Sequence, residues 1–269
     1  MSDQRGVFTL RTTNLLRKKG QWVDLNNVWN LSPQFVDTAP NSGYYAGGRE
    51  SPSSLVSTVE RVNFTTDTLS PSPAESLTAS RYGLGATGNV TDGYFGGGLG
   101  AGFYSRMDKT TYSTDTTLYA PGANLFLEVA GSAAAGNKTH GYFGGGFDID
   151  ANANTSSFTK IQYIDDDNIL VPTTQLSLAR NDLSAMGNES SGYFIGGATS
   201  SEVSIIDKLV YSVETCFQSP SLQYPASYQE VGAVGNSAYG IVAGGLGGGG
   251  TLIYDTVRKL DYSTDNFSN

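Results

Sequence analysis

A short glycine-aromatic element recurs five times along the chain, and no other feature constrains the fold as strongly. The element reads Gly, two aromatic residues, one further residue and then Gly-Gly. Its copies occupy residues 43–48, 93–98, 141–146, 192–197 and 240–245. In the last copy Ile241 and Val242 replace the aromatic pair. The copies begin 50, 48, 51 and 48 residues apart, a period typical of propellers and other repeat proteins.

A second element follows every copy: a basic residue, an aromatic residue at +3 and an acidic residue at +6. The triplets are Arg61/Phe64/Asp67, Lys109/Tyr112/Asp115, Lys160/Tyr163/Asp166, Lys208/Tyr211/Glu214 and Lys259/Tyr262/Asp265. The surrounding β-branched and aromatic residues predict a strand, and a Thr-Asp pair at its end predicts a turn. Because the triplet repeats with the fold, we interpret its charges as surface ion pairs or turn caps rather than catalytic groups.

A third element, Ala-x-Gly-Asn, precedes copies two to five and occupies residues 86–89, 134–137, 185–188 and 233–236. The Gly of each Gly-Asn stands five residues before the next glycine-aromatic element. Two short strands joined by a Gly-Asn turn form a hairpin. The element therefore predicts a first strand that pairs with the glycine-aromatic strand.

The segment from each acid to the next Gly-Asn glycine is 21 residues long in all four complete cases. A proline stands six residues after the acid, and an apolar residue stands ten after it. The two sets are Pro73, Pro121, Pro172 and Pro220, and Leu77, Leu125, Leu176 and Tyr224. Because proline is tolerated only at a sheet edge or outside a sheet, the segment predicts an outer strand and a crossover to the next unit.

Four antiparallel strands per repeat and five repeats predict an all-β, five-bladed β-propeller. The first copy lacks Ala-x-Gly-Asn, and the chain ends four residues after Asp265, too soon for a fourth strand there. Since a closed ring leaves no open sheet edges, we expect residues 21–40 to supply what is missing. The predicted domains are a leader, residues 1–20, and the propeller, residues 21–269.

Composition supports this class and excludes others. Glycine accounts for 34 of the 269 residues, Tyr and Phe number 16 and 12, and only 15% of residues are charged. A helical bundle needs more Ala, Glu, Lys and Leu, and disordered chains are poor in aromatic residues. No stretch of 18 apolar residues occurs, so we expect no membrane insertion.

Charge is distributed unevenly along the chain. The net charge is −9, but residues 1–20 carry +4 and residues 21–269 carry −13. An acidic body disfavours nucleic acid as a partner. The basic leader, with Arg11, Arg17, Lys18 and Lys19, is either a docking segment for an acidic partner or a solvated tail.

The scarcity of cysteine and histidine limits the chemistry of the chain. Cys216 and His140 are the only residues of their kinds, which excludes an intrachain disulfide and any site with several histidines. A Ser-His-Asp triad would have to use His140, and no nucleophile elbow accompanies it. The glycine runs are not followed by Gly-Lys-Ser/Thr or a helix, so they are not phosphate loops. We therefore expect no cofactor and no bound metal.

The repeat resembles that of kelch-type propellers, although it lacks their regular Trp after the third strand. Residues 93–98, 112–115 and 136–146 are more similar to repeats in virion and tail-fibre proteins of tailed phages, especially those of marine cyanobacteria. The opening residues 6–10, 20–25 and 28–29 are similar to the leaders of such proteins.

This resemblance implies a non-enzymatic appendage of a phage particle, a tail or neck fibre or a decoration protein, made in the host cytoplasm and located in the virion. It implies other virion proteins as partners through residues 1–20. A host-surface glycan or protein, or further copies of the chain, are additional candidates. It transfers no catalytic residues to this chain.

The alternative is a polysaccharide depolymerase with two carboxylates across a cleft. Its candidate acids are Asp148, Asp150, Asp165 and Asp167, and Asp148 and Asp150 also suggest a weak Ca²⁺ site. We favour solvated loop acids over either role.

Loop lengths predict where the protein binds. From the last glycine of each glycine-aromatic element to the basic residue of the triplet that follows, the steps are 13, 11, 14, 11 and 14, whereas the other connections keep their length. These variable loops, residues 49–58, 99–106, 147–158, 198–205 and 246–257, would all lie on one face of the disc. Variable insertions on one face often mark the binding side, although neutral drift of surface loops is an alternative. The candidate contact residues are Arg49, Phe103, Tyr104, Arg106, Phe147, Phe158 and Tyr254.

Overall fold

Five antiparallel sheets follow one another along the chain, one for each glycine-aromatic element. The computed structural model describes residues 42–51, 54–224 and 226–268. The first sheet contains β1 (Ser42–Ser51), β2 (Ser54–Asn63) and β3 (Thr68–Ser76). The second contains β4 (Gly85–Gly88), β5 (Asp92–Gly96), β6 (Met107–Thr111) and β7 (Thr116–Tyr119). The third contains β9 (Ala133–Gly136), β10 (His140–Gly144), β13 (Ser157–Gln162) and β14 (Asp167–Gln175).

The last two main sheets repeat this order. The fourth contains β15 (Ser184–Gly187), β16 (Ser191–Ile195), β17 (Ile205–Val210) and β18 (Thr215–Gln223). The fifth contains β19 (Gly232–Gly235), β20 (Tyr239–Ala243), β23 (Val257–Asp261) and β24 (Asn266–Ser268). The short strands β8 (Val129–Ala130), β11 (Phe147–Asp148) and β12 (Ala153–Asn154) form one small sheet, and β21 (Leu246–Gly247) and β22 (Leu252–Ile253) form another. A single 3₁₀ turn, η2 (Pro121–Ala123), is the only helical element in these ranges.

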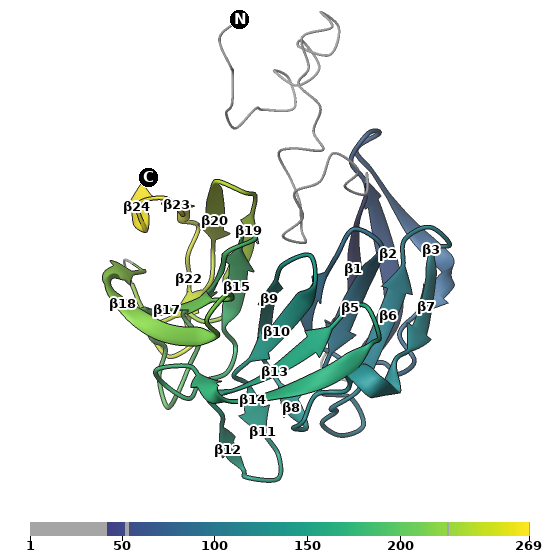
Figure 1. Ribbon diagram of the computed structural model, residues 1–269, viewed down its shortest axis with the longest axis horizontal. Coiled ribbons are helices and arrows are strands. Elements are labelled where there is room, and N and C mark those ends of the chain that lie inside the picture. The colour runs from purple at the N-terminus through teal and green to yellow at the C-terminus, as the bar shows by residue number, and fades with distance from the viewer. Residues whose placement is uncertain (1–41, 52–53, 225, 269) are drawn as a thin grey trace, which may run out of the picture.

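The sheets are arranged side by side in an arc (Figure 1). The arc runs from β1–β3, through β13 and β14, to β23 and β24. The first strands of neighbouring sheets, β4, β9, β15 and β19, contact one another along the inside. The last strands, β3, β7, β14, β18 and β24, lie at the periphery. The all-β class and the order of the four strands in a repeat are therefore confirmed.

Two sequence predictions about the ends of the arc have different outcomes. The expectation that the last repeat is too short for a fourth strand is wrong, because Asn266–Ser268 pairs with β23 as the edge strand β24. Three residues are enough because the turn at Asp265 reverses the chain at once. The first sheet has three strands within the described residues. The expected closing segment, residues 21–40, lies outside them.

The hydrophobic core is divided into four clusters, each between two consecutive sheets. For example, Tyr142 and Phe158 of the third sheet pack with Phe194 and Leu209 of the fourth. The apolar residues that recur ten positions after each acid, Leu77, Leu125, Leu176 and Tyr224, are all buried in these clusters. Each sheet thus buries its faces against its neighbours, as in other repeat proteins.

Turn chemistry explains the recurring polar residues. Each asparagine of a Gly-Asn turn accepts backbone N–H bonds from the residues two and three positions on, as Asn137 does from Thr139 and His140 at 2.9 and 3.0 Å. Each acid of the triplets, Asp67 to Asp265, closes the turn after the third strand with a φ of 50 to 55°. Asp tolerates this left-handed conformation better than most residues.

The paired glycines let neighbouring units approach closely. Gly97 and Gly98 have φ of 72 and 104°. The N–H of Gly98 donates to the carbonyl of Val129, in the crossover to the next sheet, at 2.7 Å. A Cβ on Gly97 would lie 2.8 Å from the same carbonyl. A side chain at this point would therefore force the two units apart.

The crossovers form a chain of hydrogen bonds near the inner strands. The N–H of Gly131 donates to the carbonyl of Gly83, that of Asp182 to Gly131 and that of Glu230 to Asp182, at 2.7 to 2.9 Å. All four residues have positive φ, including the non-glycine residues Asp182 and Glu230. No helix in the described ranges is long and apolar enough to cross a membrane.

Candidate functional site

The repeated triplets join neighbouring sheets in an arrangement that we call the latch. In each latch a tyrosine of the glycine-aromatic strand stacks on the tyrosine of the next repeat's triplet. The ring pairs are Tyr44–Tyr112, Tyr94–Tyr163, Tyr142–Tyr211 and Tyr193–Tyr262, with centroids 5.0 to 5.1 Å apart. The tyrosine hydroxyl also donates to the acid of that next triplet, as Tyr94 does to Asp166 at 2.5 Å.

The basic residue of each triplet pairs with the acid of the next triplet rather than with its own. The ion pairs are Arg61–Asp115, Lys109–Asp166, Lys160–Glu214 and Lys208–Asp265. The hydrogen bond and charge of Lys160 lower the pKa of Glu214 below its ordinary value. Burial raises the pKa of the latch tyrosines Tyr94, Tyr142 and Tyr193 above theirs. The latches therefore fix the sheets relative to one another, and Tyr94, Tyr142 and Tyr193 stay protonated near neutral pH.

The variable loops lie at the opposite ends of the strands from the latches and form what we call the hairpin face. In the last four repeats they fold into short hairpins or turns that pair with the adjacent crossover. Examples are the bridge from Leu99 to Tyr82 and the pairing of β11 with β8. The loops and crossovers therefore share one face, as the strand order predicts.

The aromatic candidates on this face make local contacts. Phe103 and Phe147, from neighbouring loops, have ring centroids 5.8 Å apart. Tyr254 lies against Tyr228, 4.4 Å between centroids. Tyr104 is partly buried and packs against Gly100: a Cβ added to Gly100 would lie 2.8 Å from the Tyr104 ring.

The two basic candidates lie over aromatic rings. The guanidinium of Arg49 is 4.6 Å from the Tyr82 ring, and that of Arg106 is 4.1 Å from the Tyr119 ring. Arg49 is exposed. Such contacts hold the cations in place while part of each remains available to a partner.

Phe158 does not belong to the exposed set. Its side chain is only 3% exposed, and its ring packs edge to face against the Phe194 ring, with the ring centroids 4.9 Å apart. The predicted loop, residues 147–158, ends two residues too late, because β13 begins at Ser157 and Phe158 is buried in the core. The attachment residues Arg11, Arg17, Lys18 and Lys19 lie outside the described residues.

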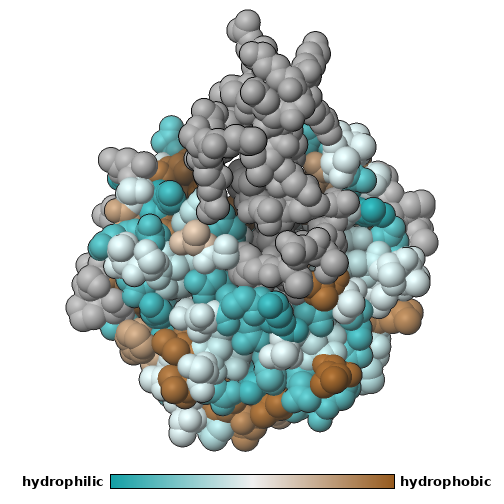
Figure 2. Space-filling view, turned by 45° about the horizontal axis from the view of Figure 1, so that its top comes forward, coloured by the Kyte–Doolittle hydropathy of each residue, from teal (hydrophilic) through white to brown (hydrophobic). Residues whose placement is uncertain are grey.

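Exposed apolar side chains do not by themselves identify a binding surface. Leu252 and Ile253 are exposed in β22 and Ile149 in the β11–β12 turn, but Leu118 and Ile164 are exposed elsewhere. On the face that Figure 2 shows, hydrophobic residues form separate groups among hydrophilic ones.

The candidate catalytic acids are distributed over both faces. Asp148 is buried, and its Oδ1 caps the β11–β12 turn by accepting the N–H of Asp150 at 3.0 Å. Asp165 lies in the turn between β13 and β14 and Asp167 begins β14, at the other end of the six-residue strand β13. At about 3.3 Å per residue, that strand spans roughly 20 Å.

The side chains of His140 and Cys216, the other reactive groups, have structural roles. His140 accepts or donates a hydrogen bond with Thr139 at 2.8 Å, and burial lowers its pKa. Burial raises the pKa of Cys216 to about 12, so the thiol stays protonated. Within the described ranges no group of three or more His, Cys, Asp or Glu side chains could hold a metal ion.

Two buried arginines are functional candidates that the sequence reasoning missed. Arg81 and Asp108 are fully buried and 2.7 Å apart, and Arg180 and Asp207 repeat this geometry in the fourth sheet. The Arg81 guanidinium also donates to the carbonyls of Gly97, Phe95 and Ala79 at 2.9 to 3.2 Å. Arg180 donates to the equivalent carbonyls of Gly196, Phe194 and Leu178. The available signal was an arginine seven residues before the Gly-Asn glycine in two repeats only.

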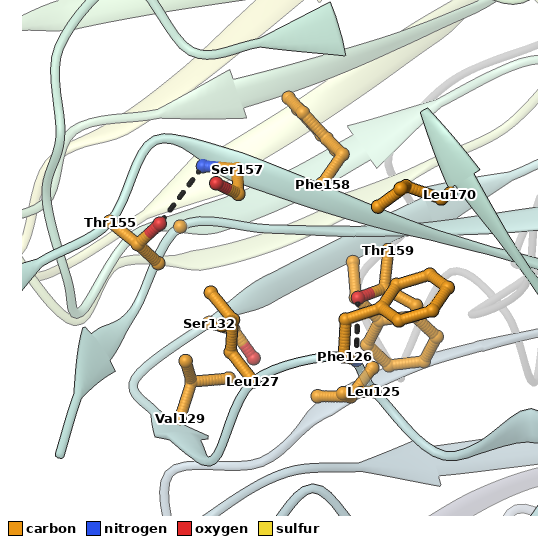
Figure 3. A pocket seen from close by; sticks show the side chains of 12 residues that line it. Leu125, Phe126, Leu127, Val129, Ser132, Thr155, Ser157, Phe158, Thr159 and Leu170 are labelled. Carbon is orange, nitrogen blue, oxygen red and sulfur yellow. Dashed lines mark hydrogen bonds between the residues drawn. The ribbon is translucent and has the colours of Figure 1, made fainter. Parts of the chain in front are cut away.

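The third sheet has a cavity where its neighbours have this ion pair (Figure 3). Val129 and Thr159 occupy the positions of the arginine and the aspartate, and Ser132 occupies that of Leu84 and Leu183. All three smaller residues line a cavity of about 120 Å³. The Oγ of Ser132 is buried and has no hydrogen-bond partner among the described residues.

No model of a known protein family matches the chain, and no curated protein matches it.

Proposed function

We propose that the chain is a non-enzymatic binding protein of a phage particle, with the hairpin face as its binding surface. The observation that carries the binding role is the contrast between the two faces. The latch face repeats the same tyrosine, cation and acid at four sheet interfaces, whereas the hairpin face varies in length from repeat to repeat. Variation confined to one face of a repeat scaffold is typical of a binding side. The assignment to a virion rests on the resemblance of the repeats to phage proteins.

We further propose that the five sheets are the blades of a closed propeller. The two ends of the arc carry the two halves of a fifth latch. Lys259 of the fifth sheet forms no ion pair with any described residue, and its Nζ lies over the Tyr239 ring at 4.2 Å. Asp67 of the first sheet is exposed and likewise lacks a cation within the described ranges.

The aromatic positions of the fifth latch are changed together. Where the other latches stack two tyrosines, the fifth would bring Ile241 against Phe64. Neither side chain has a hydroxyl, so contact between them would leave no polar group unpaired. Residues 21–40 would complete the first blade next to this junction.

The positions of the acids favour binding over glycan cleavage. Glycosidases place their two carboxyls about 5 to 9.5 Å apart. Asp148 and Asp150 stand on the hairpin face, about 20 Å from Asp165 and Asp167, so no pair that takes one acid from each group has this spacing. Asp148 is moreover engaged as a turn cap.

The proposed binding face can be tested with the double variant Phe103→Ala/Tyr104→Ala. Intact cells of the strain on which the phage grows serve as the probe, and a matched variant, Val213→Ala, alters an exposed turn on the latch face. We expect the double variant to lose at least tenfold in cell binding with an almost unchanged Tm, and Val213→Ala to bind normally. Normal binding by the double variant, or loss only in variants of the Gly-Asn turns, would contradict the assignment.

A further inference from the structure

The cavity of the third sheet can be compared, residue by residue, with the same place in the two neighbouring sheets. The correspondence is exact in spacing: Val129 stands seven residues before the Gly-Asn glycine Gly136, as Arg81 and Arg180 do before theirs. Thr159 directly precedes the triplet lysine, as Asp108 and Asp207 do.

Local hydrogen bonding supports the same correspondence. The N–H of Phe126 donates to Thr159 Oγ1 at 3.2 Å, and in the second sheet the N–H of Thr78 donates to Asp108 Oδ2 at 3.3 Å. The backbone around the cavity is therefore built like the backbone around the buried ion pair. What differs is the volume and charge of three side chains.

The cavity has the same backbone carbonyl acceptors that bind the buried arginine in the neighbouring sheets. The carbonyls of Leu127, Phe143 and Gly145 correspond to those that receive the Arg81 guanidinium, and all three residues line the cavity. No side chain among the described residues donates to them. The unpartnered hydroxyl of Ser132 adds a group that can donate or accept.

The residues that line the cavity indicate whether a bound ligand can be charged. Apart from the serines and threonines, the lining side chains are apolar: Leu125, Phe126, Leu127, Val129, Phe143, Phe158 and Leu170. No carboxylate replaces Asp108, so a buried guanidinium would have no counter-charge, which is costly. An uncharged group with N–H donors would satisfy the same carbonyls without that cost.

Access is available from the periphery of the molecule. Phe126 and Leu170, both lining residues, are 44% and 62% exposed. They place apolar surface at the mouth, where it can contact the carbon body of a ligand.

We propose that this cavity binds a small uncharged amide, such as the acetamido group of an amino sugar or a free carboxamide. The amide N–H, one in an acetamido group and two in a free carboxamide, would donate to these backbone carbonyls, and the Ser132 hydroxyl would donate to the amide oxygen. The amide's carbon substituent would lie against Phe126, Phe143 and Val129. Thr155 and Ser157 of the 147–158 loop also line the cavity, so the site adjoins the hairpin face, but its chemistry is inferred without reference to that face.

The test uses the full chain and NMR or calorimetric titration with acetamide, N-acetylglucosamine, glucose and methylguanidinium. We expect acetamide to bind and methylguanidinium to bind at least tenfold more weakly. Binding of N-acetylglucosamine but not glucose would identify an amino sugar as the source, and binding of acetamide alone would identify a small carboxamide. The proposal would be overturned if neither acetamide nor N-acetylglucosamine bound, so that water alone occupied the cavity, or if methylguanidinium bound as tightly as acetamide.

Two variants make the test specific. Ser132→Leu restores the residue of the neighbouring sheets and fills the cavity, so it should abolish amide binding without lowering the Tm. Thr159→Asp restores the carboxylate, so it should reverse the preference in favour of methylguanidinium. Unchanged amide binding by Ser132→Leu would place the ligand elsewhere and contradict the proposal.

Discussion

The Nζ of Lys208 lies 2.7 Å from the Oδ2 of Asp265, which is 57 residues further along the chain and in the next sheet. The same carboxylate accepts the hydroxyl of Tyr193 at 2.7 Å. One acid thus receives two groups from the preceding sheet, and this arrangement occurs at four successive interfaces. Each of these side-chain contacts therefore joins two consecutive repeats rather than two residues of one repeat.

Loss of one latch should destabilise the protein modestly. Tyr193→Phe removes one hydrogen bond to a carboxylate and should cost about 1 to 2 kcal/mol. Lys208→Met removes a partly exposed ion pair and should cost about 0.2 to 1 kcal/mol. Urea unfolding of the two single variants and the double variant measures both effects, with the exposed Lys138→Met as control. Fully additive costs would show that the two groups do not act through the shared Asp265.

The buried pair of Arg180 and Asp207 should matter far more. Both side chains are fully buried, and removal of one charge leaves the other without a partner. Asp207→Asn is expected to cost about 3 to 5 kcal/mol. Arg180→Met with Asp207→Leu should recover most of that loss, because no charge is then left buried. Chemical denaturation of the single and double variants distinguishes these outcomes, and a single variant as stable as the parent would refute the assignment.

Asp182 makes stability depend on pH. Burial, and then the charge of Glu230, raise the pKa of Asp182 to about 6 in the folded protein, above its ordinary value of 3.8. The folded state therefore binds this proton more tightly, and the stability gained from it is complete below pH 3.8 and lost as the pH rises through 6. Asp182→Asn should be more stable than the parent by about 1 kcal/mol at pH 7.5 and equal to it near pH 4.

Thermal unfolding between pH 4 and 8 measures this difference. Asparagine also tolerates the left-handed φ of 51° at this position. A constant difference between Asp182→Asn and the parent across the whole range would contradict the raised pKa. Glu230→Gln should lower the pKa of Asp182 and reduce the difference.

Closure of the ring can be tested by exchanging the charges of the fifth latch. Asp67→Lys and Lys259→Asp should each lower the Tm by several degrees, and the double variant should recover it, because a closed ring places the two residues together. Light scattering distinguishes closure within one chain from a contact between two copies. Failure of the double variant to recover the loss would mean that these residues do not meet.

The local structure of a repeat could be predicted because each strand and turn has its own sequence signal. The Gly-Asn turns follow from properties of single residues, and so do the prolines of the edge strands β3, β14 and β18. The fourth strand after Asp265 was missed because a three-residue strand is too short to have a hydrophobic pattern of its own.

Contacts between repeats were harder to predict. The sequence predicts that the charges of each triplet form surface ion pairs or turn caps, but the spacing within a triplet does not identify the partner. The actual partner, as in Lys109 and Asp166, is 57 residues away and depends on how the sheets pack. The buried Arg81 and the cavity at Ser132 were missed for a related reason. Their significance appears only when a residue is compared with its counterparts in the other sheets.

The most direct test of the proposed function is quantitative mass spectrometry of purified phage particles. We expect the chain at a fixed copy number per particle, resistant to salt washes, and we expect a chain lacking residues 1–20 to fold but to be absent from the particles. Abundance of the chain in infected-cell lysate together with its absence from purified particles would contradict a role in the virion.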